Sequence, residues 1–198
     1  MNTTFEGRVF VYGDNVDTDV IIPARHLTTI DPAELAMHCM EDLDPSFVST
    51  VQPGDLMVGG KNFGSGSSRE HAPISIQASG IACIVAESFA RIFFRNSVNV
   101  GLPIVECQGV TGGAETGDTF RVDLDTGIVA NVTRGTTFQG TPLPPFMRDI
   151  LDAGGLMPWV ARSLQAEGNV GVKAGSNGAA VKTGVAPNEP PQADWRLD

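Results

Sequence analysis

Strand-like and helix-like segments alternate between residues 54 and 107, and this alternation constrains the fold more than any other feature of the chain. Three short apolar runs, "GDLMVGG", "IACIVAE" and "GLPIVEC", have the length and composition of buried strands. Two segments that resemble helices, "PISIQASG" and "SFARIFFRNSVN", lie between them. Strands joined through helices pack as a parallel sheet with helices on its faces. The sequence therefore predicts an α/β fold.

The flanking segments extend this plan. "RVFVY" alternates like a first strand, and two alternating runs around Asp125-Thr126-Gly127 predict a hairpin. "DPAELAMHCM" opens with Asp31, a proline and, three residues after the aspartate, a glutamate, which predicts a capped helix. "PPFMRDILDAGG" predicts another helix, with one or two further turns after it. In the helix at 88–99 we expect Ser88 to be the cap and Phe89, Ile92 and Phe93 to face the core.

Composition and charge exclude several kinds of partner. The formal charge is −10, which argues against nucleic acid and against an anionic membrane surface. The N-terminal residues have neither a basic leader nor an apolar stretch, and no apolar run is long enough to span a bilayer. Cys39, Cys83 and Cys107 are far apart and odd in number, as in a reducing cytoplasm, and lack metal-ligand or cluster spacing. We expect them to be structural.

"GGKNFGSGSSREH" is the segment that most suggests a site. Gly64 and Gly66 allow a backbone to approach a ligand closely, and Ser67 and Ser68 add two adjacent hydroxyls. Arg69 adds a planar fork that suits a carboxylate or phosphate. If a helix begins at Ser67, its unpaired N–H groups also favour an anion. We therefore expect an anion site here.

The same segment has a purely structural interpretation. Ser67 and Glu70 have the spacing of a capping box, so these residues could simply start a helix. A catalytic Ser67 would need help, because a serine hydroxyl is too weak an acid to act as a base near neutrality. The pattern alone leaves both interpretations open.

Acidic and histidine residues elsewhere give weaker signals. Asp14, Asp17 and Asp19 follow the first strand; we interpret Asp14 as a turn former, and Asp19 could orient Arg69. The calcium-loop spacing is absent. The chain has three histidines, at positions 26, 38 and 71, and none forms a metal-ligand pair at helical spacing. The sequence thus predicts no metal site in this chain.

Four segments together resemble a known family. "TDVIIP", "NFGSGSSREHAP", "GIACIVAESFARIFFRNSVNVGLPIVE" and "ILDAGGL" are similar to the small subunits of 3-isopropylmalate dehydratase, the free-standing form of the aconitase swivel domain. The resemblance covers roughly residues 5–165. It implies a swivelling β/β/α domain of the aconitase C-terminal type over residues 1–167. Residues 168–198, rich in glycine, alanine and proline, are predicted to be a flexible tail.

The resemblance also implies a division of labour with a second chain. A separate large subunit is expected to carry a 4Fe–4S cluster, in a heterodimer or heterotetramer, and this chain is expected to bind no cofactor. By the match to "GSSRE", Ser67 would be the base that removes a carbon-bound proton. Ser68 and Arg69 would bind a carboxylate of a small dicarboxylate substrate, and Asp19, with Gly64 and Gly66, would support the site. The reaction is then a reversible dehydration and rehydration.

One departure from the family pattern concerns substrate choice. Many members have Tyr-Leu-Arg-Thr or a similar loop after "IIP", whereas this chain has His26, Leu27, Thr28 and another threonine. A threonine where an arginine would stand removes the cation that suits a third carboxylate, and an unpaired buried carboxylate is costly. We therefore expect an apolar or small substrate side group. His26, Leu27 and Thr28 are expected to line the site for that group.

These observations leave several functions to compare. The leading one is the small subunit of a cytoplasmic 3-isopropylmalate dehydratase in leucine biosynthesis. A related dehydratase for dimethylmalate, citraconate or homoaconitate is the alternative within the same class. From another class, a non-catalytic module that binds a carboxylate or phosphate would use the same serines and arginine without turnover.

Overall fold

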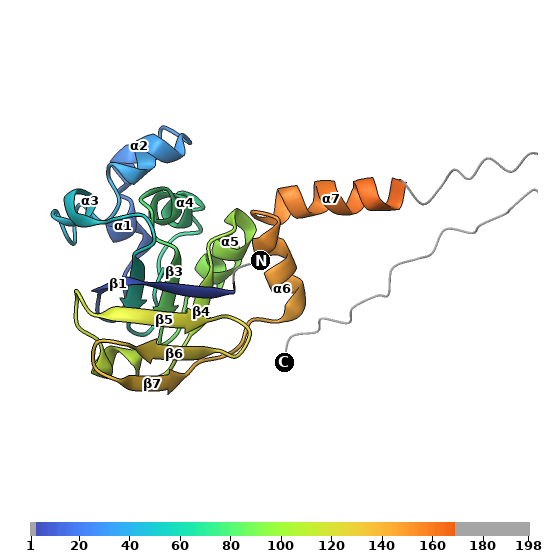
Figure 1. Ribbon diagram of the computed structural model, residues 1–198. Coiled ribbons are helices and arrows are strands. Elements are labelled where there is room, and N and C mark those ends of the chain that lie inside the picture. Colours follow the sequence, from blue (N-terminus) through green and yellow to red (C-terminus); the bar gives the residue numbers. More distant parts are fainter. Residues whose placement is uncertain (1–2, 169–198) are drawn as a thin grey trace, which may run out of the picture.

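One mixed seven-stranded sheet organises the protein (Figure 1). The computed structural model describes residues 3–168. The strand order is β4-β3-β2-β1-β5-β6-β7. The strands are β1 (Thr4–Val11), β2 (Leu56–Gly59), β3 (Cys83–Ala86), β4 (Ile104–Glu106), β5 (Thr119–Asp123), β6 (Ile128–Asn131) and β7 (Thr136–Gln139).

Strand β1 joins a parallel half of the sheet to an antiparallel half. Residues 9–11 pair in parallel with β2, and β3 and β4 continue the parallel half. Residues 4–8 pair antiparallel with β5, which continues into β6 and β7. The predicted parallel layer and the hairpin around residues 125–127 are both confirmed. Strand β7 was not predicted, because "TTFQ" is mostly exposed and has no apolar pattern.

Seven α-helices and two short 3₁₀ segments belong to the described residues. They are α1 (Thr18–Ile21), α2 (Pro32–Ala36), α3 (Phe47–Thr50), α4 (His71–Ala78), α5 (Arg91–Val100), α6 (Pro145–Asp152) and α7 (Leu156–Gly168), with η1 (Ala24–His26) and η2 (Val110–Gly113). In Figure 1, α1–α5 lie on the side of the parallel strands, and α7 projects away from the sheet. None of the described helices is both long and apolar enough to cross a bilayer.

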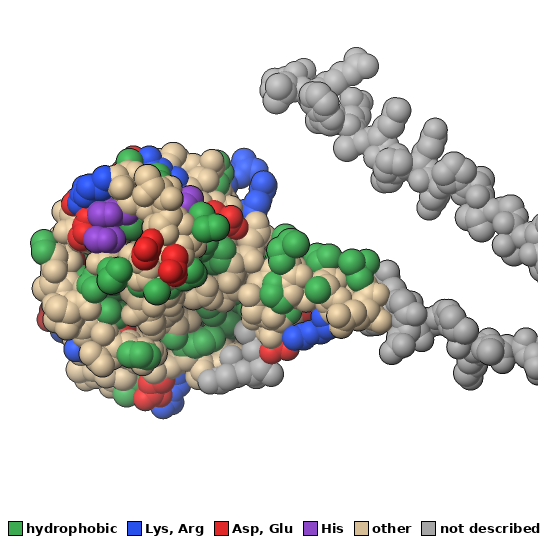
Figure 2. Space-filling model, turned by 90° about the horizontal axis from the view of Figure 1, so that it is seen from above, with side chains coloured by type: hydrophobic (Ala, Val, Ile, Leu, Met, Phe, Trp, Pro, Cys, Tyr) green, Lys and Arg blue, Asp and Glu red, His purple; other side chains and the backbone are tan. Residues whose placement is uncertain are grey.

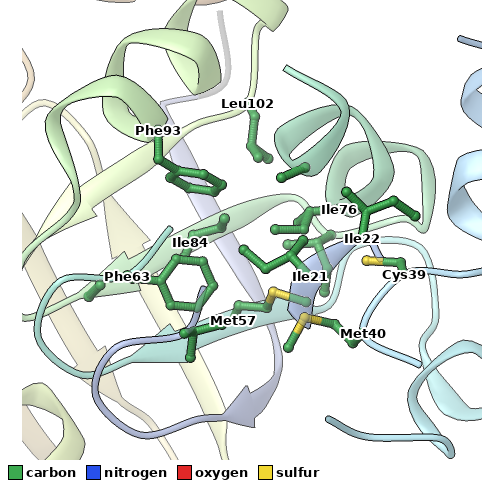
Figure 3. Close-up of a cluster of buried hydrophobic side chains, with 14 of the residues drawn as sticks. Ile21, Ile22, Cys39, Met40, Met57, Phe63, Ile76, Ile84, Phe93 and Leu102 are labelled. Atoms are coloured by element: carbon green, nitrogen blue, oxygen red, sulfur yellow. The ribbon is translucent and has the colours of Figure 1, made fainter. Parts of the chain in front are cut away.

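Apolar side chains fill both faces of the parallel strands. All four residues of β2 and of β3 are buried, as expected for strands covered on two sides. Met57 and Ile84 point into the larger core, where Phe63 and Phe93 pack edge-on at 5.5 Å (Figure 3). Leu56 and the other alternate residues enter a second core on the opposite face. The sheet therefore forms a rigid support for the loops at its ends.

Three local predictions were wrong or incomplete. Helix α5 begins after Ala90, so Ser88 is not its cap; the Ser88 hydroxyl accepts a hydrogen bond from the Asn62 N–H at 2.9 Å instead. Ile92 is 49% exposed, although Phe89 and Phe93 are buried as predicted. The helix expected over residues 31–40 ends at Ala36, although Asp31 caps it through the Ala33 N–H at 2.9 Å.

The end of the described region lies close to the predicted domain boundary. Helix α7 runs to Gly168, one residue beyond the predicted domain 1–167. The remainder of the predicted tail, residues 169–198, lies outside the described residues.

The three cysteines are buried and free, as predicted. Burial raises the pKa of Cys39 to about 12 and that of Cys107 to about 11, and it also raises the pKa of Cys83. All three thiols pack as small apolar groups within the two cores, Cys39 in the larger one and Cys83 and Cys107 in the second.

A buried aspartate in the antiparallel half predicts a sensitivity to acid. The guanidinium of Arg134, 2.6 Å from Asp118, holds the pKa of that carboxyl below its usual value, with help from Asn131. The stabilisation is present above the usual pKa and is lost as the pH falls through the lowered value. Between about pH 5 and pH 2, we expect the free energy of unfolding to fall less for Asp118→Asn than for the wild type. Urea unfolding measures this, with the exposed Glu34→Gln as control; equal slopes for Asp118→Asn and the wild type would contradict the prediction.

Candidate functional site

The glycine-rich loop, residues 60–70, lies where parallel strands end. It follows β2 and runs between the segment after β1 and the segment after β3. Phe63 donates its N–H to the Ser88 carbonyl at 3.0 Å, and the Ala90 N–H returns a bond to the Phe63 carbonyl at 2.9 Å. Ligands of open α/β sheets bind at this carboxyl end of the strands. The fold therefore places the predicted anion loop at a suitable edge.

The segment after β1 holds the loop in an extended course. The Gly64 N–H donates to the Val16 carbonyl at 2.8 Å, and the Thr18 N–H donates to the Ser65 carbonyl at 2.7 Å. Asp14 accepts a bond from the Lys61 N–H at 2.7 Å. Asp14 is thus structural, as predicted, but it ties two loops together rather than closing its own turn.

The two loop glycines have structural reasons of their own. Both have left-handed backbone conformations, with φ of +76° at Gly64 and +93° at Gly66. A Cβ on Gly64 would lie 2.1 Å from the Phe93 ring, and one on Gly66 would lie 2.5 Å from a carboxylate oxygen of Asp17. The absence of a side chain at Gly64 and Gly66 thus lets Phe93 and Asp17 pack closely against the loop backbone.

We expect Gly64→Ala to disrupt this packing. The left-handed conformation and the clash with Phe93 together should lower the free energy of unfolding by about 2–4 kcal/mol. Urea unfolding measures the loss. Gly112→Ala is the matched control, because a Cβ there meets nothing within 4 Å. Equal stability of the two variants would show that the Phe93 contact does not constrain the loop.

Ser67 does not cap a helix. Helix α4 begins at His71, and its N-cap position, Glu70, makes no side-chain cap bond. The capping-box interpretation is therefore wrong, and no helix begins directly at Ser67 to favour an anion there. The Ser67 carbonyl instead accepts bonds from the Arg69 N–H at 2.8 Å and the Thr18 hydroxyl at 3.3 Å.

The loop presents its polar groups outward. Ser67 and Ser68 are exposed, and within residues 3–168 neither hydroxyl has a hydrogen-bond partner. Arg69 is less exposed, at 20% of its side chain, and forms an ion pair with Asp19. Asp19 was predicted to orient this arginine, and the two side chains do meet. Two free hydroxyls and an oriented guanidinium thus lie next to one another on one open face.

The loop after "IIP" does not join this group directly. Leu27 packs against the larger core, and His26 stacks on His38 with ring centroids 3.6 Å apart. Thr28 lines a cavity of about 230 Å³ together with residues of α2 and its C-terminal turn. The lining of that cavity includes neither Ser67 nor Arg69.

Three features of these loops were missed from sequence. Thr18 donates hydrogen bonds to two carbonyls of the loop, through its N–H and its hydroxyl. Asp17 caps α1 by accepting a bond from the Asp19 N–H at 2.7 Å, which orders the backbone of Asp19. Glu41 binds both His26 and His38. A capping aspartate before a short apolar run gives a local signal for the Asp17 cap. Nothing in the sequence pattern signals the contacts of Thr18 and Glu41, which come from distant segments.

Comparisons with known proteins identify the family of this chain. The family model of the aconitase C-terminal domain matches residues 43–108. The chain is 60% identical over 159 residues to the 3-isopropylmalate dehydratase small subunit of Ruminiclostridium cellulolyticum, covering 80% of this chain and 98% of the relative. This chain belongs to the family of 3-isopropylmalate dehydratase small subunits. Its relatives also include the 2,3-dimethylmalate dehydratase small subunit of Eubacterium barkeri, 58% identical over 78% of this chain and 95% of that protein.

A solved structure supports the same family. The 3-isopropylmalate dehydratase (leuD) of Methanocaldococcus jannaschii superposes with a TM-score of 0.81 at 41% identity, over 85% of this chain and 99% of that chain. The swivel-domain fold expected for a member of this family is therefore confirmed. A small subunit of this family works with a large subunit, which agrees with the open face around Ser67.

Proposed function

We propose that this chain is the serine-bearing half of a two-subunit hydro-lyase that interconverts 2-isopropylmalate and 3-isopropylmalate in leucine biosynthesis. The observation that carries the proposal is the exposed group of Ser67, Ser68 and Arg69, with Arg69 oriented by Asp19. High identity to dehydratase small subunits supports the reaction class. We expect the complex to work in the cytoplasm.

Each residue has a role that follows from its chemistry. Ser67, as an alkoxide, takes the proton from a substrate carbon, and the resulting electron pair forms the carbon–carbon double bond as the neighbouring hydroxyl leaves. The cluster proposed for the large subunit would act as the Lewis acid that accepts this hydroxyl. Arg69 offers two parallel N–H donors to a substrate carboxylate, and Ser68 adds a hydroxyl donor. Asp19 is a positioning residue that fixes the fork of Arg69. The guanidinium, two residues along, also favours the negative charge that an active Ser67 must carry.

The open face supports a shared active site. A serine alkoxide and a bound dicarboxylate gain from exclusion of water, because electrostatic interactions strengthen in a low dielectric. The Ser67 side of the site is exposed, so we propose that a large subunit covers it. We also propose that the 4Fe–4S cluster is on that subunit, because the three cysteines of this chain are buried in two separate cores rather than exposed beside Ser67.

We make a separate proposal about which side group the substrate carries. Arg25 lies beside Thr28 in the loop, but its guanidinium is bound by Asp42 and Glu41. The loop therefore offers no free cation to a third carboxylate, which favours an apolar side group. Isopropylmalate fits this condition, and so does dimethylmalate, the substrate in the name of the Eubacterium barkeri relative.

We expect Thr28→Arg to shift substrate choice in the reconstituted complex. A new cation should raise kcat/KM for a tricarboxylic substrate such as homoaconitate relative to isopropylmalate by about tenfold, which corresponds to roughly 1.4 kcal/mol. Thr28→Gln is the matched control, similar in length and uncharged. If the two variants give the same substrate ratio, Thr28 does not select the side group.

The proposed function is tested by anaerobic purification of this chain from its native extract. We expect it to retain a larger protein with iron–sulfur absorbance, and the pair to dehydrate isopropylmalate. Recovery of the chain alone, without iron, would support the non-catalytic anion-binding module instead.

A further inference from the structure

A cluster of two histidines and one glutamate lies on the surface near α2. His26 is the last residue of η1, whereas His38 and Glu41 follow α2. The Nε2 atom of His26 lies 2.6 Å from Glu41 Oε1, and the Nδ1 atom of His38 lies 2.8 Å from Glu41 Oε2. The two imidazole rings are nearly parallel, at 8°. Figure 2 shows histidine side chains side by side on this surface, with charged side chains next to them.

We propose that His26, His38 and Glu41 form a binding site for a divalent transition metal ion such as Zn²⁺. Two imidazole nitrogens and one carboxylate oxygen are a ligand set that suits this class of ion. The three ligand atoms all lie within 4.8 Å of one another. Two ligands of one tetrahedral ion lie about 3.4 Å apart, given bonds of about 2.0–2.1 Å. The two ligand atoms that are farthest apart therefore need to approach each other by only a little more than about 1 Å.

The side chains have the freedom to make this movement. Parallel rings cannot both direct a nitrogen lone pair at one ion, so one ring must turn about its χ2 angle. His26 and His38 are 20% and 36% exposed, and Glu41 is 26% exposed. The cavity of about 230 Å³ beside them gives room for the turn and for water ligands. The site is thus accessible to solvent, and its three protein ligands leave at least one coordination position for water, as in an open metal site.

The protonation states are also suitable. Both nitrogens that face Glu41 donate to it when the rings are neutral; metal binding requires the opposite tautomers, with each proton on the other ring nitrogen.

Charge around the cluster permits a cation. Arg25 is the nearest positive group, and it also contacts Glu41. Asp42 binds the same guanidinium through two bonds, of 2.6 and 3.0 Å, and compensates its charge. Glu41, Asp42 and Arg25 together carry one net negative charge, and Glu34 adds a further carboxylate to the lining of the adjacent cavity.

Metal binding would connect the loop after η1 to the turn after α2. His26 belongs to the loop that leads to Thr28, and the other two ligands belong to the turn after α2. An ion would fix the loop against that turn and narrow the adjacent cavity. This inference does not depend on the proposed dehydratase activity.

The test uses the full-length chain without an affinity tag, in the absence of any other subunit. Zn²⁺ binding is measured by competition with a chromophoric chelator, and Co²⁺ is used as a spectroscopic probe of the ligand set. We expect one equivalent of Zn²⁺ to bind and Co²⁺ to give visible d–d absorption. His26→Phe and His38→Phe keep an aromatic ring in the stack but remove a ligand, and each should weaken binding by about tenfold or more. Glu41→Gln should also weaken it.

His71→Phe is the matched control, because it removes the chain's remaining histidine. It should bind Zn²⁺ as the wild type does. The melting temperature of each variant in the presence of a chelator shows whether the fold is kept. The proposal is overturned if the wild type binds no Zn²⁺, or if folded His26→Phe and His38→Phe bind it as tightly as the wild type. Equal loss of binding in His71→Phe would overturn it as well.

Discussion

Replacement of Ser67 by alanine is expected to lower turnover by the reconstituted enzyme by about 10²-fold or more. The substitution removes the one oxygen that the proposed chemistry uses to take a carbon-bound proton. Ser67 is exposed, and its side chain makes no hydrogen bond within the described region, so the fold should not change. The backbone bonds from Thr18 and Arg69 to the residue 67 carbonyl are independent of the side chain.

The kinetic pattern separates catalysis from binding. We expect kcat to fall while KM changes little, because Arg69 and Ser68 continue to bind the carboxylate. Ser49→Ala is the matched control, an exposed serine on α3 whose hydroxyl bonds only to the local carbonyl of Ser46 at 2.8 Å. A Ser67→Ala enzyme with wild-type kcat would contradict the assignment of Ser67 as base.

Replacement of Arg69 by glutamine should give the second large effect. In the assembled enzyme, Arg69 and the substrate carboxylate are proposed to form a charge pair that the large subunit shields from solvent. Loss of one member of such a pair costs about 2–5 kcal/mol, so kcat/KM is expected to fall by about 10²-fold to 10³-fold. The fall should include a clear rise in KM, unlike the effect of Ser67→Ala. Arg69→Lys should restore only part of the activity, because an ammonium group lacks the planar fork.

The control for this prediction is another arginine in an ion pair. Arg121 on β5 binds Glu6 through Nε at 2.7 Å, and it is 57% exposed. Arg121→Gln and Arg121→Lys should leave activity unchanged and alter stability by less than about 1 kcal/mol. Full rescue of activity by Arg69→Lys would indicate that only the charge at this position matters and that its geometry does not.

Local patterns predicted the parallel half of the fold and part of the site. Buried four-residue strands such as β2 and β3 are visible as short apolar runs, and the Asp-Thr-Gly turn is visible as a hairpin signal. The sequence also suggested Asp19 as a residue that could orient Arg69, and the two side chains meet although they are 50 positions apart. The strand and hairpin signals depend only on residues that are neighbours in the sequence.

The failures have a common physical cause. Ser67 has the pattern of a helix cap, but Thr18 binds the backbone of the loop from another segment, and the helix begins at His71. Tertiary hydrogen bonds thus override a local preference. Likewise, His26 and His38 are twelve positions apart and meet only because η1 folds against the turn after α2. No spacing rule within one helix could have found that contact.

The central claim is that this chain supplies half of an active site. Its most direct test is an anaerobic titration of purified cluster-bearing large subunit with this chain, with dehydration of isopropylmalate as the readout. We predict that neither protein is active alone and that activity rises to saturation at a fixed ratio of the two. Full activity of the large subunit alone, or no activity at any ratio despite formation of the complex, would contradict the account.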